Sequence, residues 1–110
     1  MTEENNFKSI NILVVEDEEF SQRFVMRILE KLGVGRIITA GDGAEALNKL
    51  AEDPKNIDLV ICDIEMPEMN GFDMVDSLQG NPSVIFITGK EKYAVEAFDK
   101  NAIDYLVKPV

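Results

Sequence analysis

The sequence has few of the features that mark a secreted, membrane-spanning or nucleic-acid-binding chain. It contains 1 cysteine, Cys62, so no disulfide can form within the chain. The opening stretch MTEENNFKSI lacks the basic and apolar parts of a signal peptide. No apolar run approaches the roughly 20 residues that a membrane helix needs. With 11 basic residues against 21 acidic ones, a net charge of -10 opposes phosphate backbones and anionic lipids. We therefore expect a cytoplasmic protein that binds cations or cationic surfaces and does not itself bind nucleic acid or membranes.

The length and composition are those of one domain. A chain of 110 residues lies near the usual size of a single domain, and a hydrophobic content of 45% can supply one core. The sequence contains no internal repeat and no low-complexity linker that would divide it. We interpret residues 1–110 as a single domain.

Short apolar, β-branched runs of strand length alternate with segments of helical spacing. The predicted strands are residues 10–16, 36–40, 57–63, 83–88 and 102–107. The strict alternation, with near-continuous apolar strands, suits a parallel sheet that is covered on both faces. The predicted fold class is therefore α/β, with an open, doubly wound parallel sheet.

Helical patterns fill the gaps between these strands. The first predicted helix has an apolar stripe, which we expect to face the core and to end at Gly33. The stripe consists of Phe20, Phe24, Ile28, Leu29 and Leu32. Asp42 and Asn70 are predicted to cap the starts of the second and third helices, and Asn101 to end the fourth, over residues 92–100.

Polar residues stand where the predicted strands end. They are Glu16, Asp17, Asp63, Thr88 and Lys108, which Pro109 follows. Ligands of open α/β sheets bind beyond the carboxyl ends of the strands, so we expect these side chains to converge on one edge. Clustered carboxylates suit Mg2+, a hard cation that keeps part of its hydration shell. Asp63 could then act as a nucleophile that forms an acyl phosphate, whose charge Mg2+ and Lys108 would offset.

Four motifs carry a resemblance to the receiver domains of two-component response regulators. ILVVEDE, VICDIEMPEMNGFD, VIFITG and DYLVKP occur in the order and at the spacing of that family, over nearly the whole chain. The resemblance implies a flavodoxin-like, five-stranded sheet of order 2-1-3-4-5. It also implies that Asp63 accepts a phosphoryl group from a sensor histidine kinase or phosphotransfer protein in a Mg2+-dependent reaction. A conformational switch would then control an output, so the domain is expected to be a signalling module and not an enzyme.

The resemblance also assigns roles within the site. Asp17, Asp63 and the backbone carbonyl of Glu65 would bind Mg2+ directly, and Glu16 would act through water. Lys108 would pair with a phosphoryl oxygen. A cis peptide bond between Lys108 and Pro109 would direct the lysine side chain toward the site.

Switch and gating residues follow from the same resemblance. Thr88 would move to hydrogen-bond the phosphoryl group, and Tyr105 would rotate inward behind it. Gly89 would leave the phosphoryl group open to water, whereas a pair formed by Glu65 and Lys90 would screen the attacking water.

The last part of the sequence bears on output and assembly. Residues 91–109 are similar to receivers that precede LytTR-type DNA-binding domains, which implies such a domain at the C-terminus of the full-length protein. The sequence ends at Val110, directly after the last predicted strand, where the family has a fifth helix. Without that helix we expect an apolar patch on one face and self-association of the chain.

Three alternative interpretations stay open. A phosphatase of the haloacid dehalogenase type also uses an aspartate nucleophile and Mg2+, but it needs Asp-x-Asp where this sequence has Glu65. A pseudo-receiver that only binds partners typically lacks one acid or the lysine. Glu16 and Asp17 could also cap the first helix instead of binding metal. Cys62 alternates away from Asp63, so we interpret it as a core residue and not a redox group.

Overall fold

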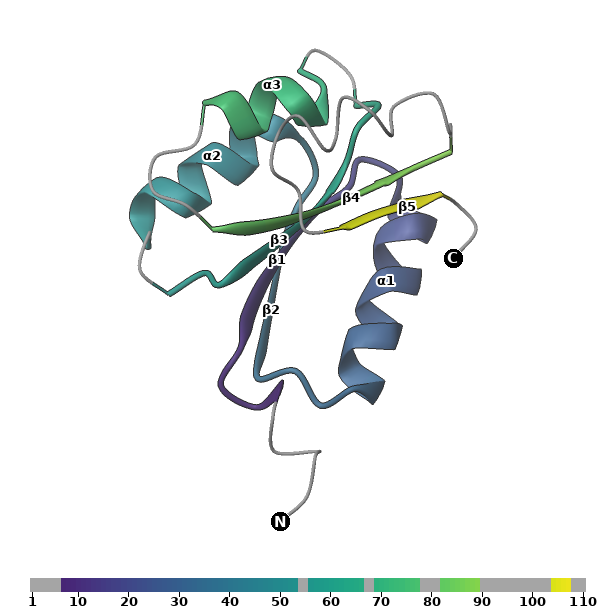
Figure 1. The fold of residues 1–110 in the computed structure, drawn as a ribbon, viewed down its shortest axis with the longest axis vertical. Helices are drawn as coiled ribbons and strands as arrows, with labels where there is room; N and C mark the ends of the chain where they lie inside the picture. The colour runs from purple at the N-terminus through teal and green to yellow at the C-terminus, as the bar shows by residue number, and fades with distance from the viewer. Residues whose placement is uncertain (1–6, 54–55, 67–68, 78–81, 90–103, 108–110) are drawn as a thin grey trace.

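Five parallel strands form one sheet in the order β2-β1-β3-β4-β5 (Figure 1). The computed structural model describes residues 7–53, 56–66, 69–77, 82–89 and 104–107. The strands are β1 (Asn11–Val15), β2 (Arg36–Ala40), β3 (Leu59–Asp63), β4 (Ser83–Thr88) and β5 (Asp104–Val107). The predicted α/β class, strand positions and strand order are confirmed.

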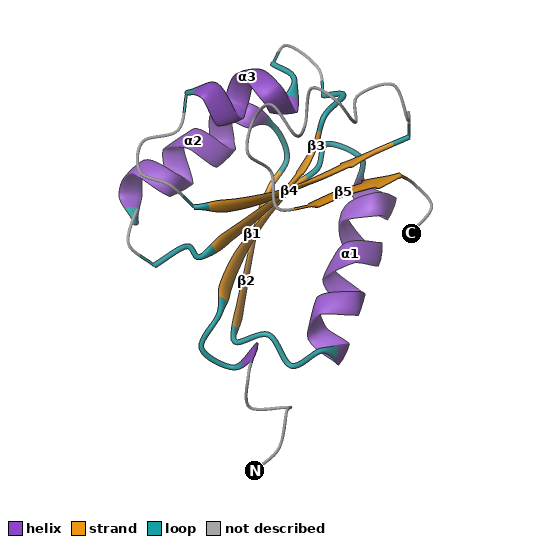
Figure 2. Ribbon diagram, in the orientation of Figure 1, coloured by secondary structure: helices purple, strands orange, loops and turns teal. Residues whose placement is uncertain are grey.

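Helices cover both faces of the sheet (Figure 2). Helix α1 (Glu19–Lys31) lies on one face, and α2 (Gly43–Glu52) and α3 (Gly71–Asp76) lie on the other. Asp42 and Asn70 cap α2 and α3 as predicted, and Gly33 follows α1 in the left-handed conformation, with φ 80. None of the helices in the described ranges is long and apolar enough to cross a membrane. The predicted helix over residues 92–100, with its end at Asn101, lies outside the described residues.

The larger part of the core lies between the sheet and helices α2 and α3. Leu13 and Val15 of β1 and Val60 and Cys62 of β3 point to this side. Phe72 of α3 meets Phe86 of β4 edge to face, with ring centroids 4.9 Å apart. Cys62 is fully buried in this cluster, which confirms its interpretation as a core residue.

The predicted apolar stripe of α1 is mostly outside the core, so that prediction was wrong. Leu29 is the stripe residue that packs on the sheet, beside Val25, which is not part of the stripe, and the other four stripe residues are exposed. The exposed fractions are 75% for Phe20, 41% for Phe24, 39% for Ile28 and 47% for Leu32. With 3.6 residues per turn, a helix buries only one narrow face against a sheet. Phe20 and the residues that follow it at steps of four, Phe24, Ile28 and Leu32, lie on the neighbouring face of the helix. No helix in the described part of the chain covers that face.

Helix α3 begins directly against the strand end that carries Asp63. The Gly71 N–H donates a hydrogen bond to the Ile64 carbonyl, at 2.7 Å. A Cβ atom at Gly71 would lie 2.5 Å from the Asp63 carbonyl oxygen and 3.1 Å from Cys62 Sγ. Only glycine fits there without a shift of backbone, so Gly71 seats α3 on the end of β3.

We predict that Gly71→Ala destabilises the fold by about 1–3 kcal/mol, because its methyl group would overlap the Asp63 carbonyl oxygen. Gly89→Ala is the matched control, since a Cβ at Gly89 meets nothing within 4 Å. Its free energy of unfolding should stay within about 0.5 kcal/mol of the unmodified protein. Urea denaturation measures both values, and equal stability of the two variants would contradict the predicted clash.

Candidate functional site

The ends of β1, β3 and β4 lie side by side at one edge of the sheet (Figure 1). Val15 pairs with Cys62, and Asp63 pairs with Ile87. Glu16 directly follows β1, Asp63 is the last residue of β3, and Thr88 is the last residue of β4. The register therefore brings together the polar residues that the sequence places at these strand ends.

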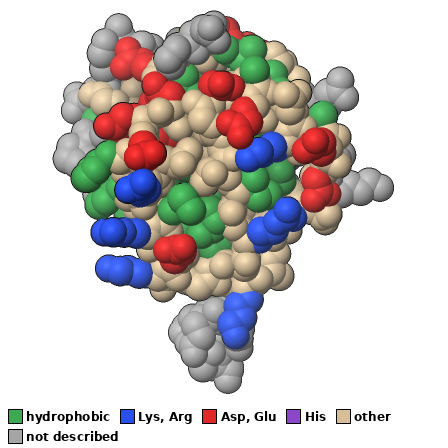
Figure 3. Space-filling view, turned by 180° about the vertical axis from the view of Figure 1, so that it is seen from behind, with side chains coloured by type: hydrophobic (Ala, Val, Ile, Leu, Met, Phe, Trp, Pro, Cys, Tyr) green, Lys and Arg blue, Asp and Glu red, His purple; other side chains and the backbone are tan. Residues whose placement is uncertain are grey.

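Three carboxylates meet at this edge. One oxygen each from Glu16, Asp17 and Asp63 lie within 4.8 Å of one another. Glu16 and Asp63 are buried, with exposed fractions of 4% and 7%, whereas Asp17 is exposed. On the face shown in the space-filling view, most acidic side chains lie in the upper part and most basic ones lie below them (Figure 3). Like charges held this close repel, and a hard divalent cation with oxygen ligands relieves that repulsion.

The start of α1 does not use the acidic pair as its cap. Glu18 is the N-cap residue, and its carboxylate accepts a hydrogen bond from the Ser21 backbone N–H at 3.0 Å. The N-cap residue is therefore Glu18, and neither Glu16 nor Asp17 occupies that position. The Glu16 carboxylate accepts a bond from the Glu18 backbone N–H at 3.2 Å, which orients it within the cluster.

The chain turns sharply after Asp63 and stays tied to the sheet. The Ile64 N–H donates to the Ile87 carbonyl at 3.2 Å, which continues the β3–β4 pairing beyond the end of β3. The Glu65 N–H donates to Asp63 Oδ1 at 3.3 Å and so orients the carboxylate. Thr88 has no exposed surface and lies beside this turn on β4.

Burial raises the pKa of the Cys62 thiol, and the nearby charges of Asp63 and Glu16 raise it further. The thiol is the form that persists at neutral pH, and its sulfur contacts the Asp63 carbonyl oxygen at 3.2 Å. Cys62 consequently lacks the thiolate character of a redox or nucleophilic cysteine.

Several predicted site residues fall outside the described part of the chain. These are Lys90, Lys108 and Pro109. The backbone of Tyr105 pairs with Phe86 within β5, but the side chain of Tyr105 is not described. The predicted roles of these residues stay predictions.

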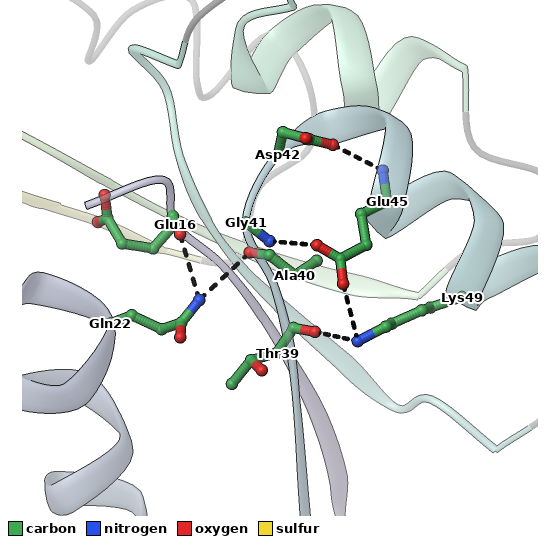
Figure 4. A network of polar contacts seen from close by, with 8 residues as sticks. All are labelled: Glu16, Gln22, Thr39, Ala40, Gly41, Asp42, Glu45 and Lys49. Carbon is green, nitrogen blue, oxygen red and sulfur yellow. Dashed lines mark hydrogen bonds and ion pairs between the residues drawn. The ribbon is translucent and has the colours of Figure 1, made fainter. Parts of the chain in front are cut away.

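Sequence reasoning missed a side chain that lies beside the acidic cluster. The Gln22 amide group donates to the carbonyl oxygens of Glu16 and Ala40, at 3.2 Å and 3.4 Å (Figure 4). One signal was present, because Gln22 precedes the buried Val25 and Leu29 by three and seven residues. That spacing places a polar side chain on the sheet-facing side of the helix.

Comparison with protein families identifies the class to which this fold and site belong. The sequence model of the family described as the response regulator receiver domain matches residues 12–110. The chain belongs to the family of response regulator receiver domains, which act in two-component signalling by accepting a phosphoryl group on an aspartate. Neither the phosphatase nor the pseudo-receiver interpretation is favoured by this match.

Curated relatives and solved structures agree with this assignment. The chain is 36% identical to the positive alginate biosynthesis regulatory protein of Pseudomonas aeruginosa in an alignment of 106 positions, which covers 92% of this chain and 42% of that protein. The chain thus spans less than half the length of the curated relatives that it matches.

Two solved receiver structures are similar over nearly the whole chain. The CheX-CheY-BeF3-Mg complex of Borrelia burgdorferi aligns with a TM-score of 0.83 and 35% identity, covering 92% of this chain and 79% of that one. The response regulator TrrA of Thermotoga maritima, in complex with Mg2+ and BeF, aligns with a TM-score of 0.80 and 33% identity, covering 90% and 86%.

Proposed function

We propose that Asp63 is the aspartate that accepts the phosphoryl group, from a sensor histidine kinase or a phosphotransfer protein. The observation that carries this proposal is the convergence of Glu16, Asp17 and Asp63, with oxygens within 4.8 Å of one another at the ends of β1 and β3. Asp63 is the member of the cluster that both ends a strand and lies beside Thr88 on β4. This position matches the nucleophile that the sequence predicts.

The donor set at this edge fits Mg2+. Asp17 and Asp63 would bind the ion directly together with the Glu65 carbonyl, and Glu16 would act through water. Bound Mg2+ would offset the negative charge on the oxygens of the transferred phosphoryl group. The two solved receivers above that contain Mg2+ with a beryllium fluoride support this choice of ion.

The chemical step requires little of the protein beyond position and charge. An Asp63 oxygen attacks the phosphorus atom, the bond from phosphorus to the donor imidazole nitrogen breaks, and the imidazole leaves with a proton taken from water. The Glu65 N–H holds the Asp63 carboxylate in place during the attack. Because the domain modifies only its own side chain, it acts as a switch and not as an enzyme with a separate substrate.

The switch follows from new contacts to the phosphoryl group. Thr88 and Lys108 would bind its oxygens, and Tyr105 would move inward behind Thr88. These contacts exist only after phosphorylation, so they shift the population toward the active conformation. Gly89 and a pair between Glu65 and Lys90 would then set the access of water, and hence the lifetime of the phosphorylated state.

The output is proposed from relatives. The Pseudomonas aeruginosa relative is a biosynthesis regulator, and another relative is named a transcriptional regulatory protein. We infer that the full-length protein controls transcription through a C-terminal DNA-binding domain, and the LytTR-type resemblance remains a prediction.

Incubation with acetyl phosphate and Mg2+ tests the assignment of Asp63. We expect intact-mass spectrometry to show one added phosphoryl group, lost in Asp63→Asn and suppressed by a chelator of divalent metal. Asp73→Asn is the matched control, because Asp73 is an exposed aspartate on α3 that should not be modified. Equal phosphorylation of Asp63→Asn would rule out Asp63 as the acceptor.

Two matched variants, each of which replaces a carboxylate with the corresponding neutral amide, test the metal ligands. Asp17→Asn and Glu16→Gln each remove one negative charge, so they lower the electrostatic attraction for Mg2+ alike. We expect Glu16→Gln to weaken Mg2+ binding about tenfold, as loss of an indirect partner does, and Asp17→Asn to weaken it further because it removes a direct ligand. Calorimetric titration measures both dissociation constants. Equal losses would show that the roles of the pair are wrongly assigned.

We also infer that this 110-residue chain self-associates through α1. The exposed side chains Phe20, Phe24, Ile28 and Leu32 form a row on one helix face. Leu106 of β5 pairs with Ile87, so both side chains lie on the α1 side of the sheet, and Leu106 is 36% exposed. Exposed apolar side chains gathered on one helix face favour association in water.

Size-exclusion chromatography with light scattering over a range of concentrations tests this inference. We expect a mass above that of the monomer, and Phe24→Gln should shift the protein toward the monomer. Phe7→Gln is the control, because Phe7 is similarly exposed but lies outside the α1 row. A monomer at every concentration would contradict self-association.

A further inference from the structure

Gln22 joins the backbone at the ends of β1 and β2, at Glu16 and Ala40 (Figure 4). Its side chain comes from the first turn of α1 and is half-buried. The amide nitrogen donates to the Glu16 carbonyl at 3.2 Å and to the Ala40 carbonyl at 3.4 Å. Two carbonyl acceptors require the NH2 group at this position, because the amide oxygen has no proton to donate. The contacts therefore fix which way the amide faces.

These bonds act on the peptide that leads into Asp17. The Glu16 carbonyl belongs to the planar peptide unit that joins Glu16 to Asp17, so a restraint on that carbonyl also orients the backbone of Asp17. The Glu16 N–H donates to the same Ala40 carbonyl at 3.0 Å. The backbone N–H of Glu16 is thus bonded directly to the end of β2, and the backbone carbonyl of Glu16 is linked to it through the Gln22 amide.

The end of β2 is itself held from the opposite face of the sheet. Lys49 of α2 donates to the Thr39 carbonyl, and the Glu45 carboxylate accepts from the Gly41 N–H at 2.8 Å. Lys49 and Glu45 form an ion pair at 3.2 Å (Figure 4). The hydrogen bond from the Gly41 N–H lowers the pKa of Glu45 most, and the contact with Lys49 lowers it further. The Glu45 carboxylate therefore stays charged. The end of β2 is thus held on its α2 side by contacts that do not involve Gln22 or the Glu16–Asp17 peptide.

We propose that Gln22 is a positioning residue for the divalent-metal site, an inference that rests on the function proposed above. Without the ion, repulsion among the three carboxylates pushes the loop that carries Asp17 away from Asp63. Gln22 resists that movement by binding the Glu16 carbonyl to β2. The site is then held close to its metal-binding geometry before the ion arrives, which lowers the cost of ordering on binding.

Gln22→Met and Lys49→Met test this role as a matched pair. Both replace a long polar side chain with methionine, and each removes contacts to the end of β2. We expect Gln22→Met to weaken Mg2+ binding about tenfold, which corresponds to about 1.4 kcal/mol. Lys49→Met should keep the dissociation constant within about twofold, because Lys49 has no bond to the Glu16–Asp17 peptide. Calorimetric titration gives both constants, and thermal unfolding without metal reports the loss of stability in each.

The outcomes separate a positioning role from a structural one. Similar losses of thermal stability with weaker Mg2+ binding only in Gln22→Met would support the proposal. Unchanged binding in Gln22→Met, or equal weakening in both variants, would overturn it. If Gln22→Met does not fold, Gln22→Asn replaces it with the same expectation, since its amide is one methylene too short. Failure of the unmodified protein to bind Mg2+ would instead overturn the proposed function itself.

Discussion

Repulsion among carboxylates is the interaction on which this site depends. A parallel sheet puts the carboxyl ends of its strands at one edge, and here that edge receives Glu16, Asp17 and Asp63 within 4.8 Å of one another. Two of the three are buried, so water screens their charges poorly. The rest of the sheet supplies the stability that keeps them together, and a cation relieves the repulsion. The same concentration of negative charge that destabilises the edge therefore suits it to the metal-assisted phosphotransfer proposed above.

Most of this arrangement could be predicted from the sequence, because local rules and the global fold agree. Alternating short apolar runs predicted β1 to β5, and the side chains of Asp42 and Asn70 marked the starts of α2 and α3. The convergence of Glu16 with Asp63 followed from one rule, that parallel strands end at a common edge. Cys62 was assigned to the core from strand alternation alone, and the structure confirms it.

Other features depend on tertiary contacts that the sequence pattern does not specify. The apolar stripe of α1 has helical spacing on two adjacent faces, and only packing against the sheet selects the face with Val25 and Leu29. Phe20 is left exposed for this reason. The role of Gln22 was also hidden, because its acceptors are backbone carbonyls of two strands that meet only in the folded sheet. Hydrogen bonds to backbone carbonyls leave no signature in the identity of the acceptor residue.

A crystal structure of the protein with Mg2+ and beryllium fluoride, which mimics a phosphoryl group on a carboxylate, tests the central claim most directly. We expect the beryllium atom bonded to an Asp63 oxygen, and Mg2+ bound by Asp17, Asp63 and the Glu65 carbonyl at about 2.0–2.1 Å. The Gln22 amide should keep its bonds to the Glu16 and Ala40 carbonyls in that complex. Beryllium fluoride attached to a different carboxylate, or Mg2+ bound away from Asp17 and Asp63, would contradict the proposed phosphotransfer site.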